Sequence, residues 1–185
     1  MNGLGGQETK DMAGDKLSET VLNYLEKHCT MTVATTQDDI PWAASVFYAN
    51  DGFNLYFLSN PMDRHSENIS ENPLVAVTVN EDYHDWRKIK GIQIDGKAEL
   101  LSTEDEIAKA NAVYAAKYPF TAAYLKLMSS PFPKLVKYLD KLLSRLPSVP
   151  SFTTTVSHRF YKVVPRKVRF IDNESNFGYH EEFEL

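Results

Sequence analysis

A serine, an arginine and a histidine lie close together in the stretch LSNPMDRHSENISENPLVAV, residues 58–77. Ser59 ends an apolar strand, and Arg64 and His65 open a short amphipathic segment that stops at Asn72–Pro73. A turn from a strand into a helix exposes backbone N–H groups, and the helix start carries a partial positive charge. Arginine adds a planar set of donors that suits phosphate, and the serine hydroxyl can donate one more hydrogen bond. The pattern therefore indicates an anion site.

The same residues also fit a plainer interpretation. Asp63 directly precedes the predicted helix and is a residue type that caps helices, which makes the stretch an ordinary solvated turn. In that case His65 either adds charge or simply packs. Turn chemistry alone favours the solvated turn, so the choice depends on what surrounds it.

A tryptophan in a polar loop is the second candidate for binding. Trp86 follows NEDYHD and lies near Tyr83, where it is either a plug for the core or a stacking surface for a planar ligand. Other chemistry finds no support. There is no GxSxG elbow, no glycine-rich nucleotide loop and no pair of histidines at metal-binding spacing. We therefore name no catalytic residue and no metal site.

Two kinds of hydrophobic spacing indicate the elements that position these residues. Helical spacing predicts helices at 17–28, 103–118 and 134–146, and β-branched or alternating segments predict strands at 30–36, 42–49, 54–59, 74–79, 88–101, 152–165 and 167–172. The turn NDG at 50–52 has hairpin chemistry, and Gly91 and Gly96 suggest a bulge, or a backbone that another group approaches closely. The apolar run LVAVTV at 74–79 suggests a strand buried on both faces.

This order of elements favours a mainly β fold, an antiparallel barrel with added helices, over a parallel Rossmann sheet. We divide the chain into a flexible lead-in at 1–16, one barrel domain at 17–172 with a helical insertion near 103–146, and an acidic tail at 173–185.

The composition limits the function classes. The net charge of −5 argues against nonspecific nucleic-acid binding, and the single Cys29 excludes an intrachain disulfide. No apolar run is long enough to span a bilayer, and the polar N-terminus does not have the pattern of a secretory signal. We expect a cytoplasmic protein with no membrane partner.

The segment from Pro41 to Leu101 resembles the pyridoxamine 5′-phosphate oxidase-like, FMN-binding split-barrel family. Three motifs carry the resemblance in order: SVFYANDGFNLYFLS, RHSENISENPLVAVTV and W-x-x-I-x-G-I-Q-I-x-G-K-A-E-L. The resemblance implies a six-stranded antiparallel split barrel that forms a homodimer, with FMN bound in clefts between the two subunits. It is closer to a less characterised branch of the family than to the vitamin B6 oxidase.

The resemblance also implies a set of cofactor-binding residues. The strand that would run beside the isoalloxazine ring contributes Ser45, Val46, Phe47 and Tyr48, and the end of the next strand, near the ribityl phosphate, contributes Leu58 and Ser59. The phosphate-binding position holds Arg64 and His65. The ring edge or the partner subunit contributes Trp86 and Gln93. His65 stands where the family has lysine, which reduces the charge because an unperturbed imidazole is mostly neutral at pH 7.

Two differences separate the chain from the vitamin B6 oxidase. Ala44 and Ala49 occupy positions where that enzyme has basic residues that serve the cofactor, and its substrate-binding basic motif near the C-terminus has no match in VSHRFYKVVPRKVRF. The resemblance therefore implies flavin binding without pyridoxamine 5′-phosphate oxidation, and predicts an FMN-dependent oxidoreductase that moves two electrons to or from a small molecule. The alternative is a split-barrel carrier or sensor that binds FMN, haem or a deazaflavin without turnover. For haem, His158 or His180 would be the candidate ligand.

Overall fold

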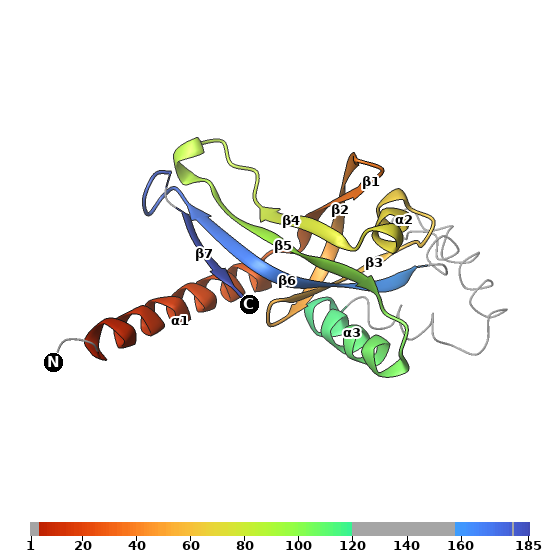
Figure 1. Cartoon of the computed structure of the whole chain (residues 1–185), viewed down its shortest axis with the longest axis horizontal. Helices are drawn as coiled ribbons and strands as arrows, with labels where there is room; N and C mark the ends of the chain where they lie inside the picture. Colours follow the sequence, from red (N-terminus) through yellow and green to blue (C-terminus); the bar gives the residue numbers. More distant parts are fainter. Residues whose placement is uncertain (1–3, 120–157, 179) are drawn as a thin grey trace.

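The computed structural model describes residues 4–119, 158–178 and 180–185 of the 185-residue chain. In chain order its elements are α1 (Leu4–Lys27), β1 (Thr30–Gln37), β2 (Ile40–Asp51), β3 (Asn54–Ser59), α2 (Arg64–Glu71), β4 (Leu74–Asn80), the 3₁₀ turn η1 (Trp86–Lys88), β5 (Lys90–Leu100), α3 (Glu104–Lys117), β6 (Arg159–Asp172) and β7 (His180–Glu184). Figure 1 shows their arrangement.

Six antiparallel strands close into a barrel. The strand order is β3-β2-β1-β4-β5-β6, and pairing between β3 and β6 joins the two ends. One edge of β6 is divided between two partners, because Arg159–Val163 pairs with β3 and Lys167–Ile171 pairs with β7. The predicted six-stranded antiparallel split barrel is confirmed, with β7 added outside the closed ring.

Tight turns and one bulge shape the strands. Asp38 and Asp39 both have positive φ, 51° and 60°, in the turn between β1 and β2, and Gly52 has φ 58° between β2 and β3. These angles belong to the hairpin turns that asparagine, aspartate and glycine tolerate. The register between β5 and β6 shifts at Gly96, where a Cβ would lie 2.5 Å from the Val164 carbonyl oxygen. The bulge predicted at Gly96 is present.

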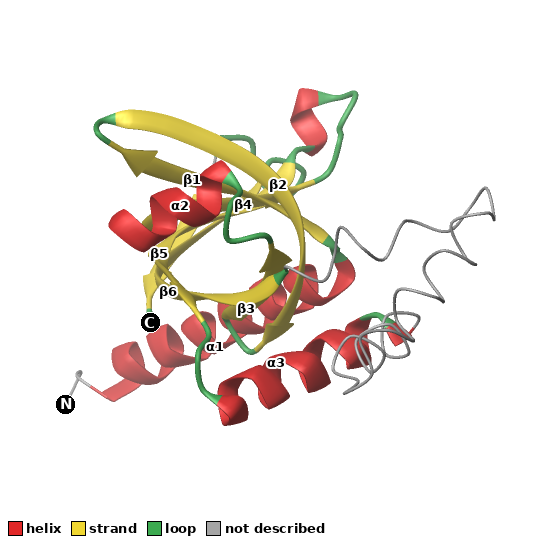
Figure 2. Cartoon of the chain, turned by 90° about the vertical axis from the view of Figure 1, so that its right-hand side faces the viewer, coloured by secondary structure: helices red, strands yellow, loops and turns green. Residues whose placement is uncertain are grey.

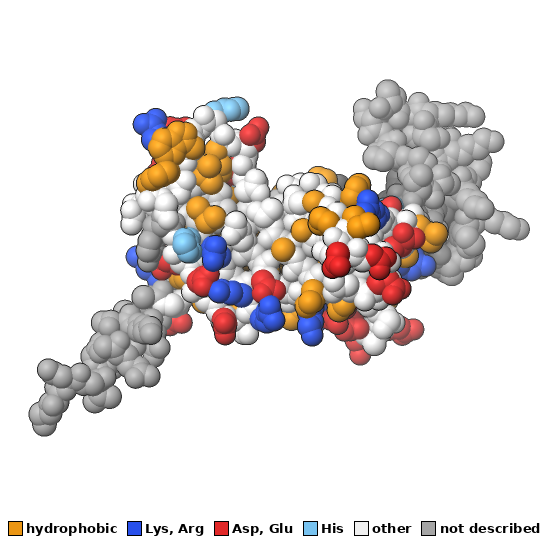
Figure 3. All heavy atoms as spheres, turned by 45° about the horizontal axis from the view of Figure 1, so that its top comes forward, with side chains coloured by type: hydrophobic (Ala, Val, Ile, Leu, Met, Phe, Trp, Pro, Cys, Tyr) orange, Lys and Arg blue, Asp and Glu red, His pale blue; other side chains and the backbone are white. Residues whose placement is uncertain are grey.

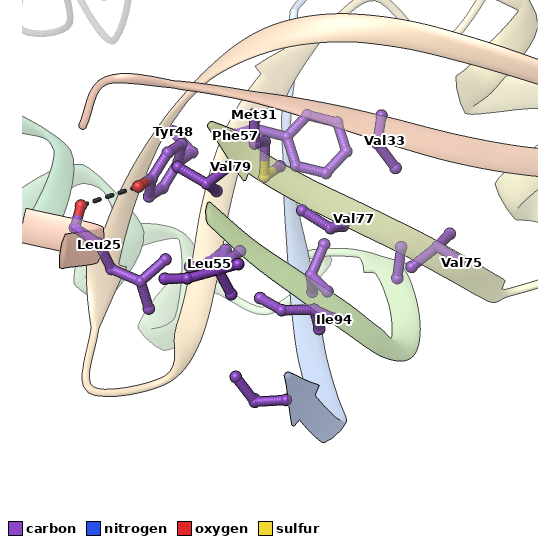
Figure 4. Close-up of a cluster of buried hydrophobic side chains, with 14 of the residues drawn as sticks. Leu25, Met31, Val33, Tyr48, Leu55, Phe57, Val75, Val77, Val79 and Ile94 are labelled. Carbon is purple, nitrogen blue, oxygen red and sulfur yellow. Dashed lines mark hydrogen bonds between the residues drawn. The ribbon is translucent and has the colours of Figure 1, made fainter. Parts of the chain in front are cut away.

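Apolar side chains from all six barrel strands fill the interior, as the close-up in Figure 4 shows. The strand β4 contributes Val75, Val77 and Val79, whereas Leu74 is 51% exposed. Its side chains therefore alternate between the interior and the outer face. The expectation that LVAVTV is buried on both faces is wrong for this chain, because no described element covers the outer side of β4 completely.

Helices close the barrel from two sides. The end of α1 places Val21 and Leu25 in the interior, and α2 adds Ile69 from the opposite side (Figures 1 and 2). The helix α1 begins at Leu4, much earlier than the predicted start at Leu17. The helix thus includes residues 4–16 of the segment that we expected as a flexible lead-in.

The helix α3 covers the outer side of β2 and β3. Its Tyr114 and Tyr118 pack with Ala49 and Tyr56 in a second apolar cluster. Thr103 caps the start of α3: its hydroxyl accepts a hydrogen bond from the Glu106 N–H at 3.3 Å and donates one to the Glu106 carboxylate at 2.6 Å. The predicted helix at 134–146 lies outside the described residues.

The last two predicted strands form one. The strand β6 runs from Arg159 to Asp172 without interruption at Pro165. We expected two strands, at 152–165 and 167–172; residues 152–157 lie outside the described part of the chain. The segment 173–185, expected as a polar tail, contains the strand β7. Its carboxylates pair with β6, since Glu182 bonds Lys167 and Arg169.

Candidate functional site

The turn between β3 and α2 is held by the Asp63 side chain. Its carboxylate accepts hydrogen bonds from the Ser59 hydroxyl at 3.1 Å and the Asn60 N–H at 3.3 Å. Although Asp63 occupies the N-cap position, its side chain makes no capping bond to the helix. The plainer interpretation of this stretch, with Asp63 as a side-chain cap, is therefore wrong in its detail: the carboxylate stabilises the turn instead.

Ser59 and His65 form a buried pair behind this turn. The Ser59 hydroxyl lies 2.5 Å from His65 Nε2, and the two residues are 3% and 7% exposed. Burial lowers the pKa of His65, and the nearby Asp63 carboxylate opposes that shift only in part. The imidazole is therefore neutral near pH 7 and positions the turn, without presenting a positive charge to solvent.

Arg64, in contrast, is exposed at the first position of α2. Its guanidinium carbon lies 4.4 Å from the centroid of the Trp42 ring. Within the described part of the chain, the guanidinium makes no hydrogen bond or ion pair. The in-plane N–H donors are thus available to an anion. Sequence analysis did not single out Trp42, because the two residues are far apart in the chain.

The strand Ser45–Tyr48 presents its side chains to two faces. The Val46 and Tyr48 side chains point into the barrel, where the Tyr48 hydroxyl donates to the Leu25 carbonyl oxygen at 2.8 Å (Figure 4). Ser45 and Phe47 point outward and are exposed. The side chains of Val46 and Tyr48 therefore cannot contribute to a site on the outer face, where only their backbone could contact a ligand.

Gln93 lies in the same cross-strand row as Ser45. Successive partners across the sheet are Ser45 with Thr32, Thr32 with Thr78, and Thr78 with Gln93. Three strand spacings of about 4.8 Å separate the ends of this row by roughly 14 Å. The adjacent row on the same face consists of Ala43, Ala34 and Ala76 and ends at Asp95, whose carboxylate pairs with Arg166. The two rows form a polar surface with a patch of small side chains.

Leu58 and Trp86 lie away from this surface within one chain. Leu58 packs against the cluster under α3. Trp86 is 61% exposed at the tip of the loop between β4 and β5, with its ring 4.6 Å from that of Phe177. Figure 3 shows hydrophobic side chains gathered at that end of the molecule, at the upper left. The Trp86 carbonyl oxygen accepts from the Asn173 side chain at 2.8 Å, which fixes the loop to the β6–β7 turn.

Lys117, like Arg64, has its cationic group next to an aromatic ring, and it is half-buried. The Lys117 amine donates to the Leu25 carbonyl oxygen at 2.9 Å and lies 4.1 Å from the centroid of the Tyr48 ring. Burial lowers its pKa to about 8. These contacts join the end of α3 to the end of α1, so the side chain has a structural role.

The described residues contain no group of three or more His, Cys, Asp or Glu side chains suited to a metal ion. The helices of the described ranges are too short or too polar to cross a bilayer.

The closed barrel and the short helix after β3 define a split-barrel protein. The family model for pyridoxamine 5′-phosphate oxidase matches residues 17–136, which is most of the chain. This protein belongs to that family.

One curated relative and two solved structures illustrate what this chain is similar to. A "UPF0306 protein" of Klebsiella pneumoniae (strain 342) is 29% identical over 126 residues, which cover 65% of this chain and 82% of the relative. A solved heme-binding protein from Mycobacterium smegmatis has a TM-score of 0.60 at 15% identity, covering 87% of this chain and 56% of its own. A FAD-binding protein from Mesorhizobium loti has a TM-score of 0.52 at 18% identity, covering 79% and 87%. At these identities the structural likeness shows the fold.

Proposed function

We propose that this protein binds FMN and uses it to move two electrons to or from a small molecule. The observation that carries the proposal is the Arg64 guanidinium, exposed at the start of α2 with its donors unpaired among the described residues. An arginine fork at a helix N-terminus is suited to a phosphate monoester such as that of FMN. Family membership and the FAD-binding relative with the same fold support the choice of a flavin.

The remaining cofactor residues are assigned by their positions around the barrel. Ser59 and His65 support the phosphate turn from behind, since they are buried and bonded to each other. The rows that contain Ser45 and Gln93 offer a surface for the isoalloxazine ring. The connection between β4 and β5, which carries Trp86, lies far from α2 (Figure 1), so we assign Trp86 to the ring edge of a second copy in a homodimer.

Bound FMN would supply the electron transfer, and the protein would supply orientation and exclusion of water. We assign no general acid or base to the chain. The substrate is not pyridoxamine 5′-phosphate in this proposal. The basic motif that binds the substrate near the C-terminus of the vitamin B6 oxidase has no match in VSHRFYKVVPRKVRF. Ala49, where that enzyme has a basic residue that serves the cofactor, is fully buried in the cluster with Tyr114 and Tyr118.

Replacement of Arg64 tests the phosphate assignment. Arg64→Ala removes a charge-assisted hydrogen bond worth about 1.5–3 kcal/mol, so the Kd for FMN should rise about tenfold to a hundredfold. Titration with FMN, followed by quenching of flavin fluorescence, measures the change. The matched control is Lys109→Ala, which removes the same charge from an exposed ion pair with Asp51 on the other side of the barrel. Equal affinities of wild type and Arg64→Ala would remove Arg64 from the site.

Haem binding without turnover is the second candidate. It is favoured by the heme-binding relative with the same fold and by His158, whose buried Nδ1 has no hydrogen-bond partner among the described residues. The absorption spectrum after addition of each cofactor separates the two functions. A Soret shift with haem and no change in the flavin bands with FMN would favour this second function over the first.

A further inference from the structure

Trp42 and Arg64 meet because α2 is fastened to the barrel beside them. The Asn68 side chain donates to the Thr35 hydroxyl at 2.9 Å, and both residues are buried. Thr35 pairs across the strands with Trp42, and Asn68 follows Arg64 by one helical turn. The anchor at Thr35 and the stack at Trp42 are therefore neighbouring contacts between the same helix and the same hairpin.

The stack has a direct effect on what Arg64 can bind. A guanidinium placed over an aromatic ring uses its face, whereas its N–H donors lie in its plane and remain free. Without the ring, the side chain could turn toward Glu67, three residues along the same helix, where an ion pair is favourable. Such an ion pair would occupy the donors and neutralise the charge.

We propose that Trp42 is a positioning residue for the phosphate end of the cofactor: its ring holds the Arg64 guanidinium away from the carboxylates of α2 with its donors directed to solvent. This inference rests on the proposed function, because the anion it serves is the FMN phosphate. The residue itself need not touch the cofactor. Its effect is predicted to depend on the phosphate group and on the presence of Arg64.

A comparison of FMN with riboflavin tests the inference, because riboflavin has the same ring and ribityl chain without the phosphate. We expect Trp42→Leu to weaken FMN binding about three- to fivefold, the size of an exposed cation–π contact, and to leave riboflavin binding unchanged. Trp42→Phe keeps an aromatic face and should retain most of the FMN affinity. In an Arg64→Ala background, Trp42→Leu should have no further effect on either ligand.

Ile40→Ala is the matched control, since it removes another exposed apolar side chain from β2. It should leave both affinities as they are, and thermal unfolding of each variant checks that the barrel is folded. An equal loss of FMN and riboflavin affinity in Trp42→Leu, no loss at all, or the same loss without Arg64 would each overturn the positioning role while the proposed function stands. A wild-type protein that binds neither ligand would overturn the proposed function and this inference with it.

Discussion

The Arg64 guanidinium is exposed at the surface, and its neighbour there is the Trp42 ring. The cation–π contact with Trp42 satisfies the guanidinium face and leaves the in-plane donors available. Behind the turn, Ser59 and His65 are buried, and burial lowers the pKa of the His65 imidazole, which keeps it neutral. The three residues that appear equivalent in the sequence thus divide into one that is available to a ligand and two that stabilise the turn.

The buried serines at this turn predict opposite effects on stability. Ser59→Ala leaves the His65 imidazole without its partner at Nε2, so the free energy of unfolding should fall by about 1–3 kcal/mol. Ser66→Ala, one residue after His65, removes a buried hydroxyl that has no partner among the described residues, and should be neutral or stabilise by up to about 1 kcal/mol. Urea unfolding at pH 7 measures both.

The two variants control for each other, since they make the same chemical change within one turn. Equal destabilisation by Ser59→Ala and Ser66→Ala would contradict the assignment of the Ser59–His65 bond as the supporting contact.

For single residues, the sequence predicts that Ser59, Arg64 and His65 lie together, but not which of them are buried and which is exposed. The strand-to-helix turn with Ser59 and Arg64 follows from Pro61 and the flanking apolar runs. The burial of His65 does not, because the local sequence RHSENISE is polar and only the packing of α2 on the barrel decides which face is covered. The stack on Trp42 depends on the same packing.

Among the elements, β6 has the most demanding position, because it pairs with three other strands. Its bulge opposite Gly96 lets one continuous strand pair with β5 along its length, even though it contains Pro165, which has no N–H to donate. Alternation predicts β5 and marks both halves of β6, but it does not show that the two halves form one strand. The strand β7 was harder to predict, since HEEFE is charged and is held in part by ion pairs from Glu182 to Lys167 and Arg169.

Two glycines test the bulge. Gly96→Ala should lower the free energy of unfolding by about 2 kcal/mol or more, because its Cβ would lie 2.5 Å from the Val164 carbonyl oxygen and 3.0 Å from Pro165 Cα. Gly14→Ala, in α1 with no heavy atom within 4 Å of the added Cβ, should instead stabilise by about 0.5–1 kcal/mol. Thermal or urea unfolding compares them. A neutral Gly96→Ala would mean that β6 can move away without cost.

For the whole molecule, closure of the barrel is the step that local sequence patterns could not supply. The pairing of β3 with β6 joins segments about a hundred residues apart, and the described strands give no local signal of it. The resemblance to the split-barrel family predicts this closure, and the topology confirms it. The same resemblance predicts a dimer with the cofactor between its subunits, and that arrangement stays a prediction.

The most direct test of the central claim is gel filtration of the protein mixed with excess FMN, with absorbance recorded in the visible range and mass measured by light scattering. We predict that the flavin bands co-elute with a peak of about 42 kDa, twice the 21.0 kDa of one chain, with one FMN bound per subunit. A protein peak with no flavin absorbance, at an FMN concentration that saturates a micromolar site, would contradict the account.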